Sequence, residues 1–373
     1  ATIEKQKAAG FPETMIMQDM KKPRATHILH RGQYNEPGGK VEPGVPAVFP
    51  RIKKNASSRL GFAQWLVDPD HPLTARVAVN RYWQRLFGVG LVKTSEDFGV
   101  RGELPSHAGL LDWLAVEFIS SGWDTKHIQR LILNSATYRQ GSHVGAAAYR
   151  KDPDNRLLAR GPRMRLDAEE IRDASLAVSG LLVSHLGGRS VYPYQPKGLW
   201  LELNNRPGYS REYKQGKGDD LYRRSIYTFW KRTVPSPMLK TFDAPGREFC
   251  TVRRSRTNTP LQALVLLNGP QYVEAARRLA ERMITEGGRT LDERITYGFR
   301  LVTARRPAAA ELEIFKDAWR AALKRYSKDG AAALRLLKVG DSPFSDSLDA
   351  RELAAMADVA RLLLNTSEAI TKG

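Results

Sequence analysis

The chain has 373 residues, 42% of them hydrophobic, which allows a sizeable core in about two or three packed units. Lys and Arg number 59 against 40 Asp and Glu, and the net charge of +19 favours an anionic partner without choosing among nucleic acid, acidic membrane, acidic or sulfated glycan and acidic protein. No apolar run approaches the roughly 20 residues that span a bilayer, so we predict no transmembrane segment.

The sequence of residues 1–58 predicts an extended, loop-rich arm that forms an interdomain junction. Residue 1 is not methionine and residues 1–10 carry no apolar signal core, so we expect the start to be a processing site or a fragment boundary. The sequence HILH at 27–30 favours a short strand, but Gly and Pro are then too frequent for regular elements. Arg31 and Tyr34 could pack between domains or face a ligand at a domain junction, where pockets are common.

Residues 59–182 predict a helical unit, which starts with a short helix over 59–67 and a longer one over 72–87. Ser106 can cap a third helix and Thr125 a fourth. Both helices carry an apolar stripe, and their short link favours an antiparallel hairpin.

Further along, Asp167 and Glu170 have the spacing of a capping box, which predicts a helix to about residue 182. Residues 183–258 are rich in Gly, Pro and Tyr and predict an irregular segment with short strands. Within it, the β-branched and aromatic sequence SIYTFW at 225–230 is the best strand candidate.

Residues 259–373 predict a C-terminal helical unit. Pro260 and Pro270 each suit the first turn of a helix, and Thr290 with Glu293 has capping-box spacing. Further helices are expected near 308–326, 331–338 and 349–364. The predicted fold class is therefore mainly α, a multi-helix domain with a loop-rich N-terminal arm and a small irregular or β insertion.

Several short motifs along the chain resemble the signature of one family. They are RVAVNRYW at 76–83, FGVGLV at 87–92, DFGVRG at 97–102, HAGLLDWLAVE at 107–117, NSATYRQ at 134–140, RLDAE at 165–169, RRSRTNTPLQAL at 253–264 and LLN at 363–365. With these motifs in this order over nearly the whole chain, the sequence resembles the planctomycete-type domain of unknown function numbered 1553.

The resemblance implies a context that composition does not show. Long members of that family carry an export signal, a cytochrome-c-like domain and another uncharacterised domain upstream. An extracytoplasmic location, in the periplasm or at the cell surface, and a role beside polysaccharide metabolism are therefore expected. No cofactor is expected in this chain, because the haem would lie in the missing upstream domain.

The first candidate site is the basic run before Pro260, where free backbone N–H groups of a helix N-terminus favour anions. Its candidate residues are Arg253, Arg254, Arg256, Asn258 and Thr259. Guanidinium groups bind sulfate, phosphate or carboxylate in pairs, so an acidic or sulfated glycan would suit this site. In the alternative interpretation, Asn258 or Thr259 caps the helix and the arginines pair with carboxylates inside the fold.

The secondary candidates lie on helices of the central unit. Asn80 and Gln84 share an apolar helix face and must be hydrogen-bonded there, either to hold a loop such as 96–103 or to line a cleft. In the second case Trp83 could serve as a sugar-stacking platform, with Arg81 beside it. The remaining cleft candidates are Tyr138 and Arg139.

Catalytic and metal chemistry find little support. Ser135 has no G-x-S-x-G setting, and paired carboxylates such as Asp167 and Glu170 are already explained by capping. The single cysteine, Cys250, is expected to be a buried, inert thiol, and no metal-ligand spacing is present.

Three functions are carried forward. The leading one is an accessory extracytoplasmic module that binds an acidic or sulfated polysaccharide or an acidic protein, next to the upstream domains of the same polypeptide. The rival is a hydrolytic or redox-coupled enzyme that acts with the missing haem domain. Nucleic-acid binding is the weakest, because no recognised fold signature supports it and an exported location argues against it.

Overall fold

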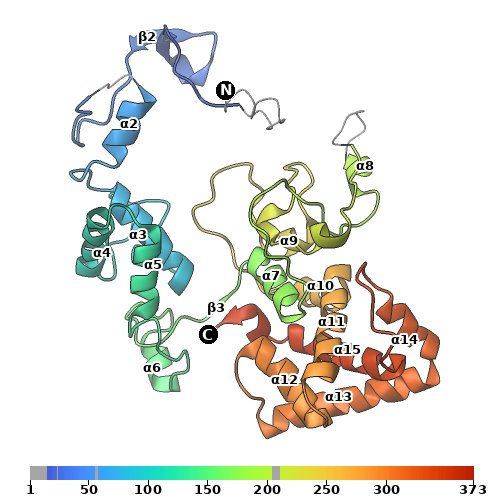
Figure 1. Cartoon of the computed structure of the whole chain (residues 1–373). Helices are drawn as coiled ribbons and strands as arrows, with labels where there is room; N and C mark the ends of the chain where they lie inside the picture. Colours follow the sequence, from blue (N-terminus) through green and yellow to red (C-terminus); the bar gives the residue numbers. More distant parts are fainter. Residues whose placement is uncertain (1–14, 23, 55–57, 204–210) are drawn as a thin grey trace, which may run out of the picture. The chain divides into compact units, whose positions relative to one another are not determined.

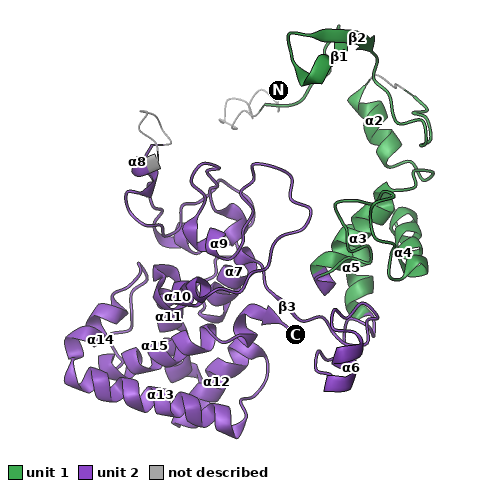
Figure 2. Cartoon of the chain, turned by 180° about the vertical axis from the view of Figure 1, so that it is seen from behind, with its two compact units in different colours: residues 1–85, 89–134 green, residues 86–88, 135–373 purple. Residues whose placement is uncertain are grey.

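A computed structural model describes residues 15–22, 24–54, 58–203 and 211–373 (Figure 1). The chain divides into two compact units, coloured separately in Figure 2. Unit 1 comprises residues 1–85 and 89–134, and unit 2 comprises residues 86–88 and 135–373. The described chain is mainly helical with small strand pieces, which confirms the predicted fold class.

Unit 1 contains a hairpin and a group of helices. Its elements are β1 (Thr26–Leu29), η1 (His30–Gly32), β2 (Pro37–Val41), α2 (Arg59–Leu66), α3 (Thr74–Phe87, whose last residues count with unit 2), α4 (Ala108–Ser120) and α5 (Thr125–Asn134). The helices predicted for this region are all present, and α4 and α5 pack on each other as predicted.

Unit 2 begins with an irregular part that carries short elements. These are α6 (Ala146–Lys151), β3 (Met164–Arg165), α7 (Ala168–Val178), α8 (Leu199–Leu203), η2 (Gly218–Leu221), η3 (Ser225–Tyr227) and α9 (Pro237–Thr241). A helical part follows, with α10 (Pro260–Asn268), α11 (Pro270–Glu286), α12 (Leu291–Thr303), α13 (Ala309–Lys328), α14 (Gly330–Leu337), α15 (Ala350–Leu364), η4 (Glu368–Ile370) and β4 (Thr371–Lys372).

The arm contains β2, a strand in a stretch where the density of Gly and Pro argued against regular structure. β1 pairs antiparallel with β2, and Thr26 lies opposite Val41. A glycine is required at position 38 of β2, because a Cβ there would lie 3.0 Å from the carbonyl oxygen of Ile28. Glycine therefore permits the close approach of the two strands.

The helix starts follow the local sequence closely, with two exceptions. Ser106 was predicted to cap α4, but the N-cap is His107, whose side chain makes no capping hydrogen bond. The backbone N–H of Asp167 donates to Glu170 at 2.8 Å, and that of Thr290 donates to Glu293 at 2.9 Å, which confirms both capping boxes. Thr125 was predicted to cap α5, but Asp124 does so by accepting from the backbone N–H of Lys126 and His127. Aspartate is the stronger acceptor at this position.

The strand predicted at 225–230 is wrong. Residues Ser225–Tyr227 form the 3-10 helix η3, and only Thr228 makes an isolated bridge, to Val191. The N–H of Ser225 donates to the Asp173 side chain of α7 at 2.8 Å, and the only backbone pairing with another segment is that of Tyr227 and Phe229 with Val191 among the described residues. Tertiary contacts have overridden the local strand propensity.

The main core of unit 2 lies among α11, α12, α13, α14 and α15, which Figure 1 shows packed together. Alanines of α11 and α15 are fully buried where these helices meet, so the two backbones can approach closely. A second cluster joins α7, α9 and α10 through Ile171, Leu239 and Leu266. The irregular part thus packs on the helical part.

Candidate functional site

The basic motif before α10 and the RLDAE motif before α7 meet in one cluster of charges. Asp167, the N-cap of α7, is only 4% exposed. The Arg254 guanidinium donates to both carboxylate oxygens of Glu169, at 2.6 and 3.2 Å, and lies 3.2 Å from Asp167. A fork of this kind fixes the loop before α10 against the first turn of α7.

Arg256 and Thr257 extend this cluster. The Arg256 guanidinium lies 3.8 Å from Asp167 and donates to the carbonyl oxygen of Gly88 at 3.2 Å. The backbone N–H of Thr257 donates to Asp243 at 2.8 Å, and Asp243 also pairs with Arg165 at 2.5 Å. Seven motif residues from three separate stretches of sequence therefore interlock.

Lys372 of β4 is half-buried at the edge of the same cluster. Its ammonium donates to the carbonyl oxygen of Leu86 at 3.0 Å and lies 3.7 Å from the centre of the Tyr138 ring. Burial lowers the pKa of Lys372 to about 8, although the nearby Glu170 opposes the shift. Burial also raises the pKa of Tyr138. The Tyr138 ring thus packs against the Lys372 ammonium and does not line an open cleft.

The charges of this cluster balance one another. Its carboxylates are Asp167, Glu169, Glu170 and Asp243, and its cations are Arg165, Arg254, Arg256 and Lys372. The internal pairing that the sequence left open is therefore what Arg254 and Arg256 make, whereas Arg253 and Asn258 are exposed. Thr259 is the N-cap of α10 and bonds Gln262. Anion binding by these five residues stays a prediction.

In unit 1, Asn80 holds a loop. It is fully buried and exchanges hydrogen bonds with the backbone of Val92, at 2.9 Å to the N–H and 3.1 Å to the carbonyl oxygen. Ser95 bonds both Asn80 and Gln84. The loop is thus held at residues 92–95, just before the predicted stretch, and the side chains of Asn80 and Gln84 are occupied.

Trp83 does not offer a stacking platform in this structure. It is 4% exposed and belongs to the buried hydrophobic residues of α3. A sugar ring needs an open aromatic face, so the cleft interpretation lacks its central residue. Arg81 on the same helix is exposed.

A substitution at Gly90 tests whether Asn80 holds the loop at residues 92–95. A Cβ at this position would lie 2.5 Å from the carbonyl oxygen of Val92 and 2.6 Å from the Asn80 amide nitrogen. We expect Gly90→Ala to lower the free energy of unfolding of unit 1 by about 2 kcal/mol, because the loop or Asn80 must shift. Equilibrium unfolding followed by circular dichroism measures this. Gly109→Ala in α4 is the control, since its Cβ meets nothing within 4 Å; equal stability of the two variants would contradict the assignment.

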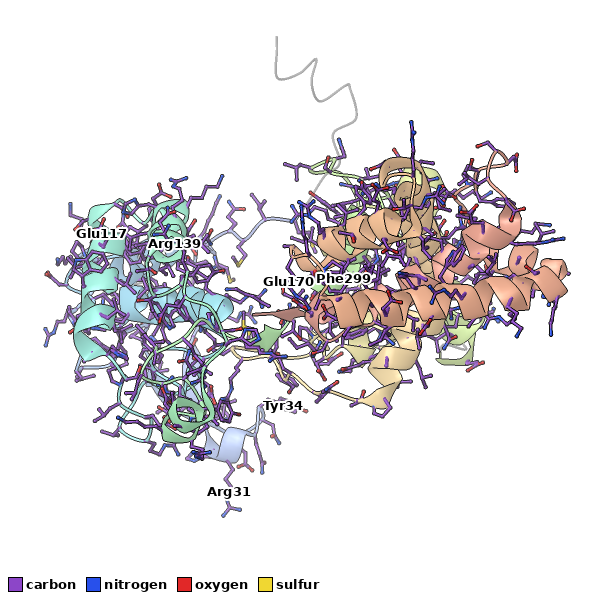
Figure 3. The ribbon with its side chains drawn as sticks, turned by 90° about the horizontal axis from the view of Figure 1, so that it is seen from below. Arg31, Tyr34, Glu117, Arg139, Glu170 and Phe299 are labelled. Atoms are coloured by element: carbon purple, nitrogen blue, oxygen red, sulfur yellow. The ribbon has the colours of Figure 1, made fainter. Side chains whose placement is uncertain are left out.

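The other secondary candidates do not gather into a site. Arg31 has a left-handed backbone (φ 50°), and its side chain points away from the ribbon in Figure 3. Tyr34 is also exposed on the arm, and Arg139 is exposed in unit 2. Nothing in the described residues brings Arg31 or Tyr34 toward a cavity of unit 1.

Basic residues without acidic partners lie in the stretch that leads to the cluster. We call residues 223–256 the basic segment; it holds nine Lys or Arg and two acidic residues. Within the described residues, no carboxylate lies within 4.0 Å of Arg232, Lys240 or Arg247. Arg247 instead covers the ring of Trp230, with 4.7 Å from the guanidinium to the ring centre. The sequence showed the excess of charge but not which cations stay unpaired.

Unit 2 contains an aromatic hollow that was not predicted from the sequence. It has a volume of about 410 Å³ and lies between residues 195–201 and 212–215 of unit 2. Trp200 and Tyr213 line it, and Tyr192 and Phe229 pack behind them. The recurrence of Tyr, Trp and Phe through this irregular stretch was the available signal.

In the part of the chain that the structure describes, no three His, Cys, Asp or Glu side chains gather as metal ligands, and no helix is long and apolar enough to cross a membrane. Cys250 was expected to be buried, but it is exposed, as is the neighbouring Phe249.

Comparisons with known proteins give one match. A family model described as PSD1, protein of unknown function (DUF1553), matches residues 58–319. This range contains the basic segment, the aromatic hollow and every residue of the charge cluster except Lys372. No curated protein and no solved structure was found to match the chain.

Proposed function

The chain belongs to the PSD1 family of proteins of unknown function (DUF1553), and we propose that it is a module that binds an acidic or sulfated polysaccharide outside the cytoplasm through its basic segment. One observation carries the proposal. The basic segment exposes cations that the fold does not neutralise, whereas the neighbouring arginines of the charge cluster are paired internally.

Arg232, Lys240 and Arg247 are the residues that would contact the ligand. All three are exposed, and Lys240 lies on α9, whose neighbours Leu239 and Phe242 are buried in the core. Lys240 is therefore attached to a fixed framework and loses little backbone freedom on binding. The field of a strongly basic surface also attracts a polyanion before contact.

Arg247 and Trp230 offer the arrangement closest to a specific contact. The Trp230 ring N–H donates to the carbonyl oxygen of Gly246 at 3.2 Å, which holds the ring beneath the guanidinium. A stacked guanidinium keeps its edge free to donate two parallel hydrogen bonds to a sulfate or a carboxylate. Lysine at this position would keep the charge and lose the fork.

Removal of the three cations tests the proposal. We expect the variant Arg232→Ala/Lys240→Ala/Arg247→Ala to bind heparin and polygalacturonate about tenfold more weakly, since exposed charge contacts contribute up to about 1 kcal/mol each. Calorimetry at two salt concentrations measures the affinity, and dextran serves as the uncharged polysaccharide. Binding of the unsubstituted chain should weaken as salt rises.

A matched variant separates the site from net charge alone. Arg300, Arg306 and Lys324 are also exposed, lie outside the basic segment and carry the same total charge. Their triple alanine variant is expected to keep most of the affinity. Equal losses of affinity in the two variants would mean that the basic segment attracts polyanions through net charge alone. Binding of dextran as tight as that of heparin would contradict an anionic ligand.

A further inference from the structure

Unit 2 contains a pocket that the proposed function does not use. Its volume of about 480 Å³ falls in the range of ordinary ligand pockets. The lining residues come from three parts of the chain, within 142–163, 299–315 and 366–373, and Phe299, labelled in Figure 3, is one of them. Two arginines and two glutamates line the pocket, so it presents both signs of charge in equal number.

The acidic part of the pocket is formed by Glu311 and Glu368 around one guanidinium. Arg305 donates to both carboxylate oxygens of Glu311, at 2.8 and 2.7 Å, and to both of Glu368, at 2.8 and 2.7 Å. It also donates to the carbonyl oxygen of Arg306, so all five of its N–H groups are used. One cation therefore lies between two carboxylates, and this group keeps a net negative charge.

The two carboxylates remain accessible to a ligand. The side chain of Glu311 is 35% exposed and that of Glu368 is 38% exposed. Hydrogen bonds from Arg305 and from the backbone N–H of Ala308 lower the pKa of Glu311 to about 2, so this carboxylate is ionised at neutral pH. A carboxylate has about four acceptor positions, and Glu368 uses two of them on Arg305. An ammonium group can therefore bind here without displacing the guanidinium.

Arg163 forms the basic part of the pocket. It is exposed, and a Cβ on Gly373 would lie 2.9 Å from its Cγ and 3.4 Å from the Ser142 hydroxyl, which places the three residues together. Among the residues that the structure describes, no carboxylate lies within 4.0 Å of Arg163. Its guanidinium is therefore free to donate two parallel hydrogen bonds to a carboxylate of a ligand.

We infer that this pocket binds a short zwitterionic peptide, one with a free amino group and a free carboxylate. The amino group donates to Glu311 and Glu368, and the carboxylate accepts from Arg163. These residues line one pocket without pairing with one another, so the opposite charges of the ligand lie apart. The ends of a dipeptide are separated by up to about 7 Å, whereas the two charges of a free amino acid share one carbon atom. Ile314, which is 65% exposed, offers a contact to an apolar side chain of the peptide.

Four related probes test the two ends of the ligand separately. The full chain is titrated with leucyl-leucine, its N-acetyl form, its C-terminal amide and free leucine, and binding is followed by calorimetry and saturation-transfer NMR. Leucyl-leucine is expected to bind tightest, and loss of either terminal charge should weaken binding about tenfold, the effect of one hydrogen bond to a charged group. No binding of leucyl-leucine, or equal binding of all four probes, would overturn the inference. Free leucine that binds as tightly as leucyl-leucine would contradict a ligand of peptide length.

The variant Arg163→Gln tests the carboxylate contact. It should bind leucyl-leucine about tenfold more weakly and bind the amide as the unsubstituted chain does, because the amide has no carboxylate for Arg163. Arg163 is exposed, so the substitution should leave the fold intact. Arg150→Gln, exposed in α6 and outside the pocket, is the matched control and should bind both probes normally. Equal losses for the two probes would contradict the assigned contact.

The inference goes beyond the polyanion proposed above, since no residue of this pocket belongs to the basic segment. Heparin binding is measured on the same samples and should be unchanged in Arg163→Gln. Failure of the peptide probes is therefore distinguishable from failure of the polyanion proposal. Displacement of leucyl-leucine by heparin would contradict two separate sites.

Discussion

Replacing Arg172 with alanine is expected to lower the free energy of unfolding of unit 2 by about 4 kcal/mol. Arg172 is 1% exposed in α7, and its guanidinium donates to the carbonyl oxygens of Leu221 and Arg223 at 2.7 and 2.9 Å. It also donates to Ser225 and Gln271 at 3.1 and 3.0 Å. Alanine would leave these acceptors buried without a donor and would open a cavity.

The conservative variant Arg172→Lys distinguishes the guanidinium from its charge. A single ammonium cannot reach acceptors on Leu221, Arg223 and Gln271 together, so lysine should recover little of the lost stability. Arg300→Ala, at an exposed position, provides the control. Equilibrium unfolding followed by circular dichroism gives the values. A loss below about 1 kcal/mol for Arg172→Ala would show that the network contributes little.

Replacing Arg254 with alanine is expected to cost about 3 kcal/mol, mainly because Asp167 is buried and would lose its nearest counter-ion. The loss should appear as instability of unit 2 and not as weaker heparin binding. This result separates the two interpretations that the sequence left open for the basic motif, since an arginine reserved for a ligand would cost little stability on removal.

A double-mutant cycle isolates the Arg254–Glu169 fork. In a Glu169→Gln background, Arg254→Ala should cost about 1 to 2 kcal/mol less than in the unsubstituted chain, because the two groups donate and accept directly. Additive losses would mean that the fork contributes nothing. A stable Arg254→Ala variant with heparin affinity reduced about tenfold would return Arg254 to the ligand-binding residues.

Local sequence signals predicted the helical part of the fold well. Pro260, Pro270 and the box of Thr290 with Glu293 act within one turn, so their effects do not depend on the rest of the chain. The strand expected at Ser225 failed for the opposite reason. The backbone N–H of Ser225 donates to Asp173, and Arg172 donates to the Ser225 hydroxyl; both partners lie about 50 positions earlier, and no local pattern reveals such contacts.

In the candidate site, too, local sequence predicted the features that depend on a short stretch and missed those that depend on distant contacts. The sequence marked the basic motif and also the possibility of internal pairing, yet it could not name Glu169 as the partner of Arg254, because that contact joins residues 85 positions apart. For Trp83 the motif left open whether the ring faces a cleft, and only the packing of α3 shows that the ring is buried. Charge can be counted in a sequence, but its neutralisation depends on the fold.

The way that arginines bind backbone in unit 2 affects how its stability is best measured. Arg172, Arg223 and Arg165 donate to carbonyl oxygens of the irregular part, so guanidinium groups supply bonds that strands would otherwise make. Guanidinium chloride adds the same ion to the solvent, where it competes for those oxygens and screens the charge cluster. It would therefore loosen the irregular part ahead of the core among α11, α13 and α15. Urea, which is uncharged, keeps the two parts closer to a single transition and is the denaturant to use.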